Sequence, residues 1–395
     1  MAHDDSTRIL ISRATAQRLA ADMNRRRFLG VAGAGALATM FLAACGGDDG
    51  GSSAATGGST AGSTSSGGTS FNLYTWAEYD DPEVLEAFGN ITVDVYDSNE
   101  IAISKLSTAK GTSGYDMVCP TGAYIPQMVG LGLLQELDLG KIPNFANLET
   151  AYTNQVWDPG NKHSVCKDWG STGWIYDNTV VKTPINSWSD FIKAAQTEAS
   201  GATSVLDTAP DLCGIYFWAN GIDWNTEKAA DLDACEKFIV DELASHLKAF
   251  DSFPGISLTS GNYALSQAFN GDARQGLLKV EEAGGDPTQY TWGLGAPASE
   301  LWMDNWCILQ DAKNTDACYK FINYILQPAE SAKEVAFHGY HTGVKGVAEA
   351  SADLQYADMI FFTDAQVKTL QGGVVNTAQS RQVDILAKAK AKAGA

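Results

Sequence analysis

Apolar and polar residues follow a regular order over residues 71–131, which come directly after a stretch of small and polar residues. Short apolar runs with the two-residue period of a strand precede segments with the spacing of an amphipathic helix. The pattern predicts, in order, a strand at 71–76, a helix at 82–88, a strand at 92–96, a helix at 100–109, a strand at 115–119 and a helix at 124–131. This β-α-β-α-β order is typical of parallel strands joined by right-handed crossovers.

The rest of the chain continues as a mixture of helices and strands. Helices are predicted at 231–243, 243–250 and 317–326, and a buried strand is predicted at 302–309. Residues 71–395 exceed the length that one hydrophobic core usually serves. We therefore expect an α/β protein with two domains.

The N-terminal segment has the features of an export signal. In NRRRFLG (24–30) the arginines precede Phe-Leu in a twin-arginine pattern, and an apolar run rich in Gly and Ala continues to Leu42. This run is shorter than the roughly 20 residues of a membrane-spanning helix, so we interpret 1–44 as a removable signal segment. An N-terminal membrane anchor is the alternative. The sequence LAAC matches a lipobox and predicts lipidation of Cys45.

Residues 45–70 form a flexible linker in this interpretation. The sequence from Gly46 to Ser70 consists of small and polar residues and cannot bury a core. It would tether the folded part to a lipid on the outer face of the cytoplasmic membrane. Three aspartates make the first 22 residues unlike a normal signal, and Met23 offers an alternative start.

The chain is acidic, with 47 Asp+Glu against 27 Lys+Arg and a formal net charge of −20. Nucleic-acid binding requires basic patches, so this balance argues against a nucleic-acid partner. It favours cationic ligands through electrostatic steering. Solubility or a salty habitat is the alternative cause of the overall charge.

Motifs of the common enzyme classes are missing from the sequence. It contains no P-loop, no GxSxG and no HExxH. It also has no CxxC and no Cys/His cluster with zinc spacing. We therefore expect no catalytic residues, no cofactor and no metal site, and we favour ligand binding over turnover. A secreted hydrolase and a structural lipoprotein are remote alternatives.

Aromatic residues and a carboxylate occur in positions that suit an organic cation. Trp76 ends the first predicted strand and Tyr79 lies just beyond it, where the carboxyl edge of an open α/β sheet binds ligands. Trp302 and Asp304 occur in LWMDNW, and Tyr340 occurs in HGYHTG. Aromatic faces attract an ammonium group through cation–π interaction, and a carboxylate adds a charge-assisted hydrogen bond.

With these residues the chain resembles the bacterial spermidine/putrescine-binding proteins, the periplasmic receptors of polyamine ABC importers. The resemblance covers most of residues 71–392, in the motifs YTWAEY, YDSNE, YDMVCPTGAYIPQM, DWGSTGWIYD, SWSDF, LWMDN and FINYIL. It implies a type II-like periplasmic-binding-protein fold, with two lobes joined by crossover strands around a ligand cleft. Lobe one is expected at 71–172 plus 303–348, and lobe two at 173–302 plus 349–395.

The resemblance also implies a set of ligand-binding residues. Aromatic side chains would stack on the ligand, Thr121 stands where the family has a serine, and Asp211 stands where it has a glutamate that holds the second amine. Asp304 matches the carboxylate that grips the first amine. The predicted ligand-binding residues are Trp76, Tyr79, Thr121, Asp211, Lys279, Trp302, Asp304 and Tyr340.

Three positions depart from the family pattern. Ala123 replaces a tyrosine, and Thr208 replaces an acid three residues before Asp211. Lys279 falls where the family has a ligand-stacking tryptophan. A lysine beside a cationic ligand is unfavourable unless a neighbour in the following Glu-Glu pair, 281–282, offsets its charge. It would suit an amine that also bears a carboxylate, which is the alternative ligand.

The resemblance implies a protein that captures a putrescine- or spermidine-like amine and delivers it to an ABC permease and its ATPase. We expect a monomeric, exported lipoprotein. Besides Cys45 the chain has six cysteines, and sequence alone does not fix their pairing. The two lobes that the resemblance implies are compatible with three disulfides, each within one lobe. The alternative is that all six cysteines are buried free thiols. The expected pairs are Cys119–Cys166, Cys213–Cys235 and Cys307–Cys318.

Overall fold

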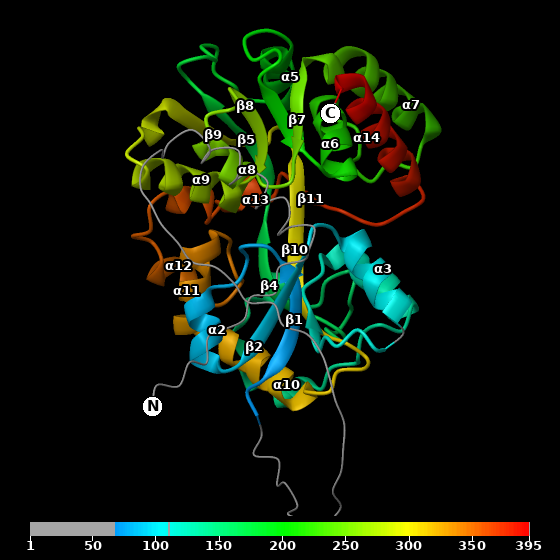
Figure 1. Ribbon diagram of the computed structural model, residues 1–395, viewed down its shortest axis with the longest axis vertical. Helices are drawn as coiled ribbons and strands as arrows, with labels where there is room; N and C mark the ends of the chain where they lie inside the picture. Colours follow the sequence, from blue (N-terminus) through cyan, green and yellow to red (C-terminus); the bar gives the residue numbers. More distant parts are fainter. Residues whose placement is uncertain (1–67, 110, 395) are drawn as a thin grey trace, which may run out of the picture.

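The structure is a computed structural model that describes residues 68–109 and 111–394 (Figure 1). It consists of two α/β lobes, one built around a six-stranded sheet and the other around a five-stranded sheet. We call them the first and the second lobe. The two-lobe α/β fold predicted from the sequence is thereby confirmed. The predicted signal segment, Cys45 and the linker lie outside the described residues, and no helix within the described part is long and apolar enough to cross a membrane.

The first lobe has helices on both faces of its sheet. Its strands are β1 (Phe71–Trp76), β2 (Ile91–Tyr96), β3 (Met117–Val118), β4 (Val165–Gly170), β10 (Ser299–Ile308) and β11 (Leu370–Gly372). β1 lies between β2 and β3 and is parallel to both, as the β-α-β-α-β pattern predicts. β10 runs antiparallel to β3 and β4. The helices are α2 (Pro82–Phe88), α3 (Asn99–Ala109), α4 (Ile125–Gly130), α10 (Thr315–Ile325), α11 (Pro328–His338) and α12 (Val347–Ala350).

The period of two along β1 divides the core of the first lobe between the sheet faces. Phe71 and Leu73 join the cluster of α2 and α10, whereas Tyr74 joins the cluster of α3 and α4. Burying apolar side chains on both faces is typical of parallel strands covered by helices. β1 therefore ends in a rigid setting, and the residues just beyond it are positioned at the carboxyl edge of the sheet.

The second lobe repeats this arrangement. Its strands are β5 (Thr172–Asp177), β6 (Thr203–Leu206), β7 (Leu247–Asp251), β8 (Leu265–Phe269) and β9 (Tyr290–Leu294), in the order β7-β6-β8-β5-β9. A cluster of aromatic side chains that includes Trp174, Trp188 and Trp218 lies in its core. The helices are α5 (Trp188–Gln196), α6 (Ala209–Ala219), α7 (Ala229–Lys237), α8 (Pro254–Thr259), α9 (Asn270–Glu282) and α14 (Gln379–Ala393). The short helix α13 (Asp364–Val367) packs Val367 against the core of the first lobe.

The chain passes repeatedly between the lobes. β4 ends at Gly170 and β5 begins at Thr172, so only Ser171 separates a strand of one sheet from a strand of the other. β10 begins beside β5, where the Ser299 hydroxyl donates to the Thr172 carbonyl at 2.6 Å, and it continues into the first lobe (Figure 1). The lobe boundary expected between residues 302 and 303 falls inside strand β10. Residues after 348, which were expected in lobe two, pack into the cores of both lobes. The lobe boundaries expected from the sequence stay a prediction.

The helix predicted at 243–250 is wrong. A π-helical turn ends at Leu243, a 3-10 turn covers Ala244–His246, and Leu247–Asp251 is strand β7, paired in parallel with β6. Leu243, Leu247 and Phe250 are four and three residues apart, which imitates one face of a helix. The other late elements are confirmed within a few residues as α7 with the π turn after it, α10 and β10.

The three predicted disulfides are contradicted, because all six cysteines are free and buried. Strand alternation explains one pair: Cys307 joins the core cluster of α3 and α4, whereas Cys318 of α10 packs on the opposite face of the sheet. Cys235 instead directs its sulfur toward the carbonyl of Cys213 at 3.9 Å. Similarly, the Cys166 sulfur lies 3.7 Å from the Thr342 carbonyl. These cysteines behave as small apolar core residues.

We expect six thiols in a chain that starts at Gly46. After denaturation without reductant, mass spectrometry should show six alkyl groups added per chain. In the native protein the same reagent should react slowly, because burial raises the pKa of thiols such as Cys119 and blocks access to them. Fewer than six alkyl groups after denaturation would contradict the free-thiol assignment.

Candidate functional site

A cavity of about 510 Å³ lies between the two lobes and is lined by residues of both. This volume falls within the range of about 300–1,000 Å³ that is usual for small-molecule sites. All eight ligand-binding residues predicted from the sequence line it. They come from segments that are far apart in the chain, so the fold brings the predicted set together in one place. Their roles in binding stay a prediction.

Aromatic side chains form the walls. Trp76, the last residue of β1, donates from Nε1 to the carbonyl of Cys119 at 3.1 Å, which fixes the plane of its ring. Trp302 stands edge-on against Tyr340, with ring centroids 4.7 Å apart, and edge-on against Phe269 at 5.9 Å. Sequence reasoning missed Phe269, which ends β8. Such walls suit an alkyl chain and the cation–π attraction of an ammonium group.

Asp304 marks one acidic end of the cavity. Its Oδ2 accepts a hydrogen bond from the Tyr79 hydroxyl at 2.8 Å, and Thr121 lies beside it through an isolated β-bridge. Its Oδ1 is buried and has no hydrogen-bond partner among the described residues. Burial raises the pKa of Asp304 to about 7, and the charge of Asp168 adds to this effect. A buried acceptor without a donor is costly, so this atom is suited to a ligand that donates hydrogen bonds.

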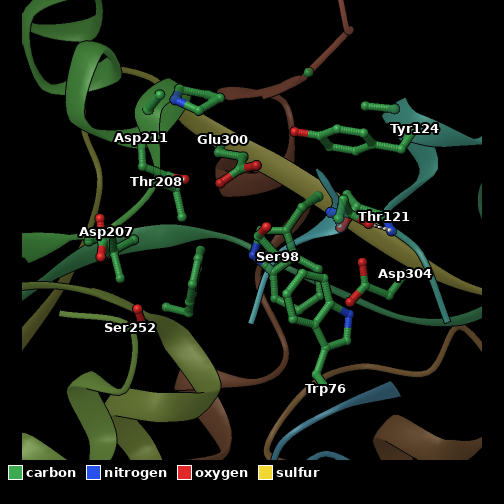
Figure 2. A pocket seen from close by; sticks show the side chains of 18 of the residues that line it. Trp76, Ser98, Thr121, Tyr124, Asp207, Thr208, Asp211, Ser252, Glu300 and Asp304 are labelled. Atoms are coloured by element: carbon green, nitrogen blue, oxygen red, sulfur yellow. Dashed lines mark hydrogen bonds between the residues drawn. The ribbon is translucent and has the colours of Figure 1, made fainter. Parts of the chain in front are cut away.

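Asp211 and Glu300 mark the other acidic end (Figure 2). Asp211 lies in the first turn of α6 and accepts from the hydroxyls of Thr208 and Thr172, the latter at 2.9 Å. Glu300 lies in β10 and is 2.9 Å from the same Thr172 hydroxyl. Sequence reasoning missed Glu300. The alternation of a strand would have revealed it, since positions 300, 302 and 304 of β10 share one face.

A second missed carboxylate is Asp272. It lies in the first turn of α9 and is 3.3 Å from the Tyr340 hydroxyl, which donates to it. Burial raises its pKa to about 7. Acids dominate the lining as a whole, and the only basic side chain among the described lining residues is Lys279. The acidic lining residues are Glu78, Asp97, Glu100, Asp207, Asp211, Asp251, Asp272, Glu300 and Asp304.

Lys279 is already paired. Its ammonium lies 3.1 Å from the carboxylate of Glu78, which follows β1 in the first lobe, and its side chain is half exposed. The pair connects the two lobes at the rim of the cavity. The neighbours 281–282, which the sequence offered as charge partners, are not among the residues that line the cavity. Glu78 offsets the lysine instead.

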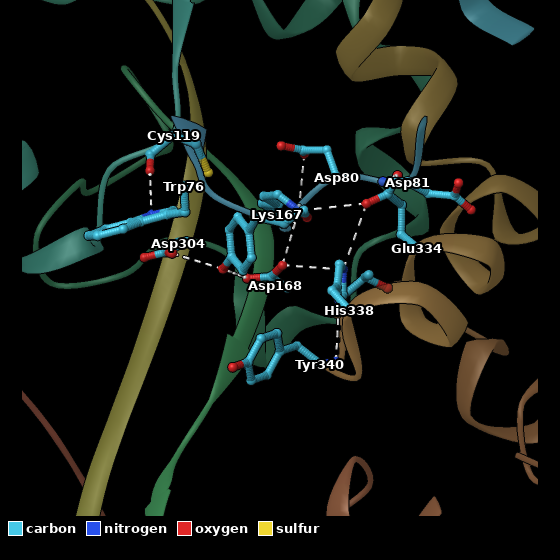
Figure 3. A network of polar contacts seen from close by, with 12 residues as sticks. Trp76, Asp80, Asp81, Cys119, Lys167, Asp168, Asp304, Glu334, His338 and Tyr340 are labelled. Atoms are coloured by element: carbon cyan, nitrogen blue, oxygen red, sulfur yellow. Dashed lines mark hydrogen bonds and ion pairs between the residues drawn. The ribbon is translucent and has the colours of Figure 1, made fainter. Parts of the chain in front are cut away.

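A buried ionic network supports the Asp304 end from behind (Figure 3). Lys167 of β4 lies 3.3 Å from Asp80, 3.2 Å from Asp168 and 3.7 Å from Glu334, and it donates to the Tyr79 carbonyl at 3.0 Å. Burial opposes its charge, but the carboxylates, Asp168 first, hold its pKa well above the usual value. The Tyr79 hydroxyl contacts both Asp168 and Asp304, and thereby links the network to the cavity.

His338 closes the network on its far side. Its Nε2 lies 3.3 Å from Asp168, and its Nδ1 accepts from the backbone N–H of Tyr340 at 3.0 Å. Burial and the charge of Lys167 lower its pKa well below the usual value, so the imidazole is neutral. The network thus fixes both Tyr79 and Tyr340. No group of residues in the described ranges has the arrangement of a metal site.

The sequence model of the bacterial extracellular solute-binding proteins matches residues 83–363. The chain belongs to this family. It is 31% identical over 277 residues to the spermidine/putrescine-binding periplasmic protein 1 of Haemophilus influenzae, covering 68% of this chain and 74% of that protein. It is 29% identical over 291 residues to the putrescine/agmatine-binding protein of Pseudomonas aeruginosa, covering 70% and 78%.

A solved structure agrees with these relatives. The spermidine/putrescine ABC transporter substrate-binding protein of Streptococcus pneumoniae superposes with a TM-score of 0.67 at 25% identity, over 82% of this chain and 99% of that one. Members of this solute-binding family bind substrates for transporters and are not enzymes, and the same holds for this chain. Its relatives are periplasmic, which makes it an exported protein.

We expect Lys167→Met to destabilise this solute-binding protein by about 3–5 kcal/mol, because three buried carboxylates lose their cation. Urea unfolding followed by tryptophan fluorescence measures the loss. Lys162→Met, at an exposed position five residues earlier, is the matched control and should change stability by less than about 0.5 kcal/mol. Equal effects of the two substitutions would contradict the role of the network.

Proposed function

We propose that this solute-binding protein is the receptor of an ABC importer for a polyamine or a related small amine. The main observation behind this proposal is the charge of the cavity. Nine acidic side chains line it, and the single lysine among its described lining residues forms an ion pair with Glu78. Aromatic walls between two acidic ends match an alkyl chain with an ammonium group at each end. The names of the relatives, which specify putrescine, spermidine and agmatine, support this ligand class.

The receptor would bind its ligand between the lobes and present the closed form to a permease and its ATPase. Asp304 lies in the first lobe, and Asp211 lies on α6 of the second. A ligand that contacts both favours the closed arrangement over the open one, because it gains contacts only there. Export as a lipoprotein through Cys45 belongs to the same proposal and rests on the sequence of residues 24–45. The proposed receptor acts as a monomer.

An amine that also bears a carboxylate is the alternative ligand. Lys279 is the described lining residue that could bind such a group, but Glu78 occupies its ammonium. Calorimetric titration separates the two classes by comparing putrescine with 4-aminobutanoate, which has the same chain length and one carboxylate. The proposal expects heat and a change in tryptophan fluorescence with putrescine. Binding of 4-aminobutanoate alone would favour the alternative, and binding of no small cation would remove the amine proposal.

Asp304→Asn should weaken amine binding by about 1.5–3 kcal/mol, roughly ten- to a hundredfold, because a buried charge-assisted hydrogen bond becomes neutral. Asp316→Asn is the matched control, since this aspartate is exposed on α10. Calorimetry gives both dissociation constants, and circular dichroism checks that the variants fold. An unchanged affinity in Asp304→Asn would show that this carboxylate does not hold the ligand.

Amine affinity should fall as the pH decreases through 7. The pKa values of Asp304 and Asp272 are raised to about 7 in the empty protein, and a bound ammonium favours their ionised forms. Affinity is therefore full above pH 7 and declines below it, by up to about tenfold per pH unit for each carboxyl that must lose a proton. Titrations between pH 5.5 and 8 measure the slope, which should become shallower in Asp304→Asn.

A further inference from the structure

Asp211 and Glu300 reach the cavity from different elements and meet at one hydroxyl. Asp211 belongs to α6 and Glu300 to β10, while Thr172 is the first residue of β5. The Thr172 Oγ1 lies 2.9 Å from an oxygen of each acid. Neither carboxyl group forms an ion pair with any described residue, whereas the nearby Asp207 is paired with Lys390 of α14. The two acids are therefore a pair without a counter-ion.

The single hydroxyl between them restricts their protonation. A threonine hydroxyl has one proton and can donate to only one of two acceptors. If both carboxyl groups were ionised, the one that receives no hydrogen bond would face the hydroxyl oxygen. It would also lie beside the negative charge of the other carboxylate in a buried setting. The contacts are satisfied when one carboxyl group keeps a proton. In agreement, burial raises the pKa of both acids, and the charge of Asp211 adds to the effect at Glu300.

Among the described residues, the titratable groups that act on this pair are acids and a tyrosine. Asp304 lies further along β10, and Tyr124 with its partner Glu100 faces Glu300 from the first lobe. None of these groups is a cation. An independent observation indicates a donor ligand in the same cavity: Oδ1 of Asp304, whose residue is 5% exposed, has no partner among the described residues. The cavity thus contains a bare acceptor at one end and the acid pair at the other.

We propose that Asp211 and Glu300 together bind one ammonium group of the ligand and hold a shared proton when the cavity is empty. Binding replaces the proton: the ammonium forms N–H···O bonds to both carboxylates, and the displaced proton leaves to the solvent. The inference rests on the proposed amine-binding function and adds Glu300 to its ligand residues. A primary ammonium or a guanidinium has enough N–H donors to bridge the pair, but a quaternary ammonium has none. The pair therefore selects against tertiary and quaternary ammonium groups, which have fewer than two N–H donors.

Calorimetry with putrescine tests the exchange. Titrations at pH 7 in buffers with different heats of ionisation give the number of protons released per ligand bound. In Glu300→Gln the amide replaces the protonated carboxyl, so putrescine should still bind through the remaining carboxylates. Affinity should fall about tenfold or more, and proton release should decrease by about one per ligand. Glu282→Gln, at an exposed position of α9, is the matched control and should release as many protons as the natural protein.

The outcomes separate this inference from the function on which it rests. If the natural protein binds no amine, the proposed function is wrong. If it binds putrescine but Glu300→Gln releases as many protons, the shared proton is wrong and the function stands. Glu300→Asp, which keeps the carboxyl group, should restore proton release toward the natural value. In the absence of ligand, the protonated-carboxyl band in infrared spectra should be weaker in Glu300→Gln than in the natural protein, because Asp272 and Asp304 contribute to this band in both. An unchanged intensity would also overturn the inference.

Discussion

The crowding of carboxylates around one cavity between the lobes is the constraint on which the rest of the structure depends. Desolvated like charges repel, and each one needs a cation, a donor or a proton to remain in place. Behind the cavity, the buried ammonium of Lys167 forms ion pairs with three carboxylates. At the rim, Glu78 pairs with Lys279 and Asp207 with Lys390. Inside the cavity, Asp211, Glu300 and Asp272 accept from hydroxyl groups and form no ion pair with the described residues, so they are available to an incoming cation.

The site residues are held by elements whose positions the core determines. β1, with alternate side chains in two hydrophobic clusters, sets Trp76 at the sheet edge, and the Lys167 network then fixes Tyr79 through its carbonyl and hydroxyl. In the second lobe, α6 begins just after β6, which places Asp211 in the first helical turn facing the cavity. Such preorganisation reduces the ordering cost that a ligand would otherwise have to overcome.

Much of this arrangement could be predicted from the sequence, and the misses have physical reasons. The regular apolar pattern after Phe71 indicated the parallel sheet, and the motif resemblance indicated residues that the fold does bring together. The partner of Lys279 could not be found, because Glu78 is 201 residues away and no local pattern relates them. The apolar spacing at 243–250 is typical of a helix, but residues 247–251 form a strand because they pair with β6. The Cys307–Cys318 disulfide failed because the alternation along β10 directs Cys307 to the sheet face opposite Cys318.

Both acidic ends of the cavity share one strand, and this has a consequence for selectivity by length. Glu300 and Asp304 are four residues apart in β10, so their Cα atoms are separated by about 13 Å of extended backbone. A hinge movement of one lobe against the other changes access to the cavity, but it does not stretch a hydrogen-bonded strand. The spacing between these two carboxyl-bearing positions is therefore a property of the backbone, already set in the open protein. Discrimination between shorter and longer solutes can begin before the lobes meet.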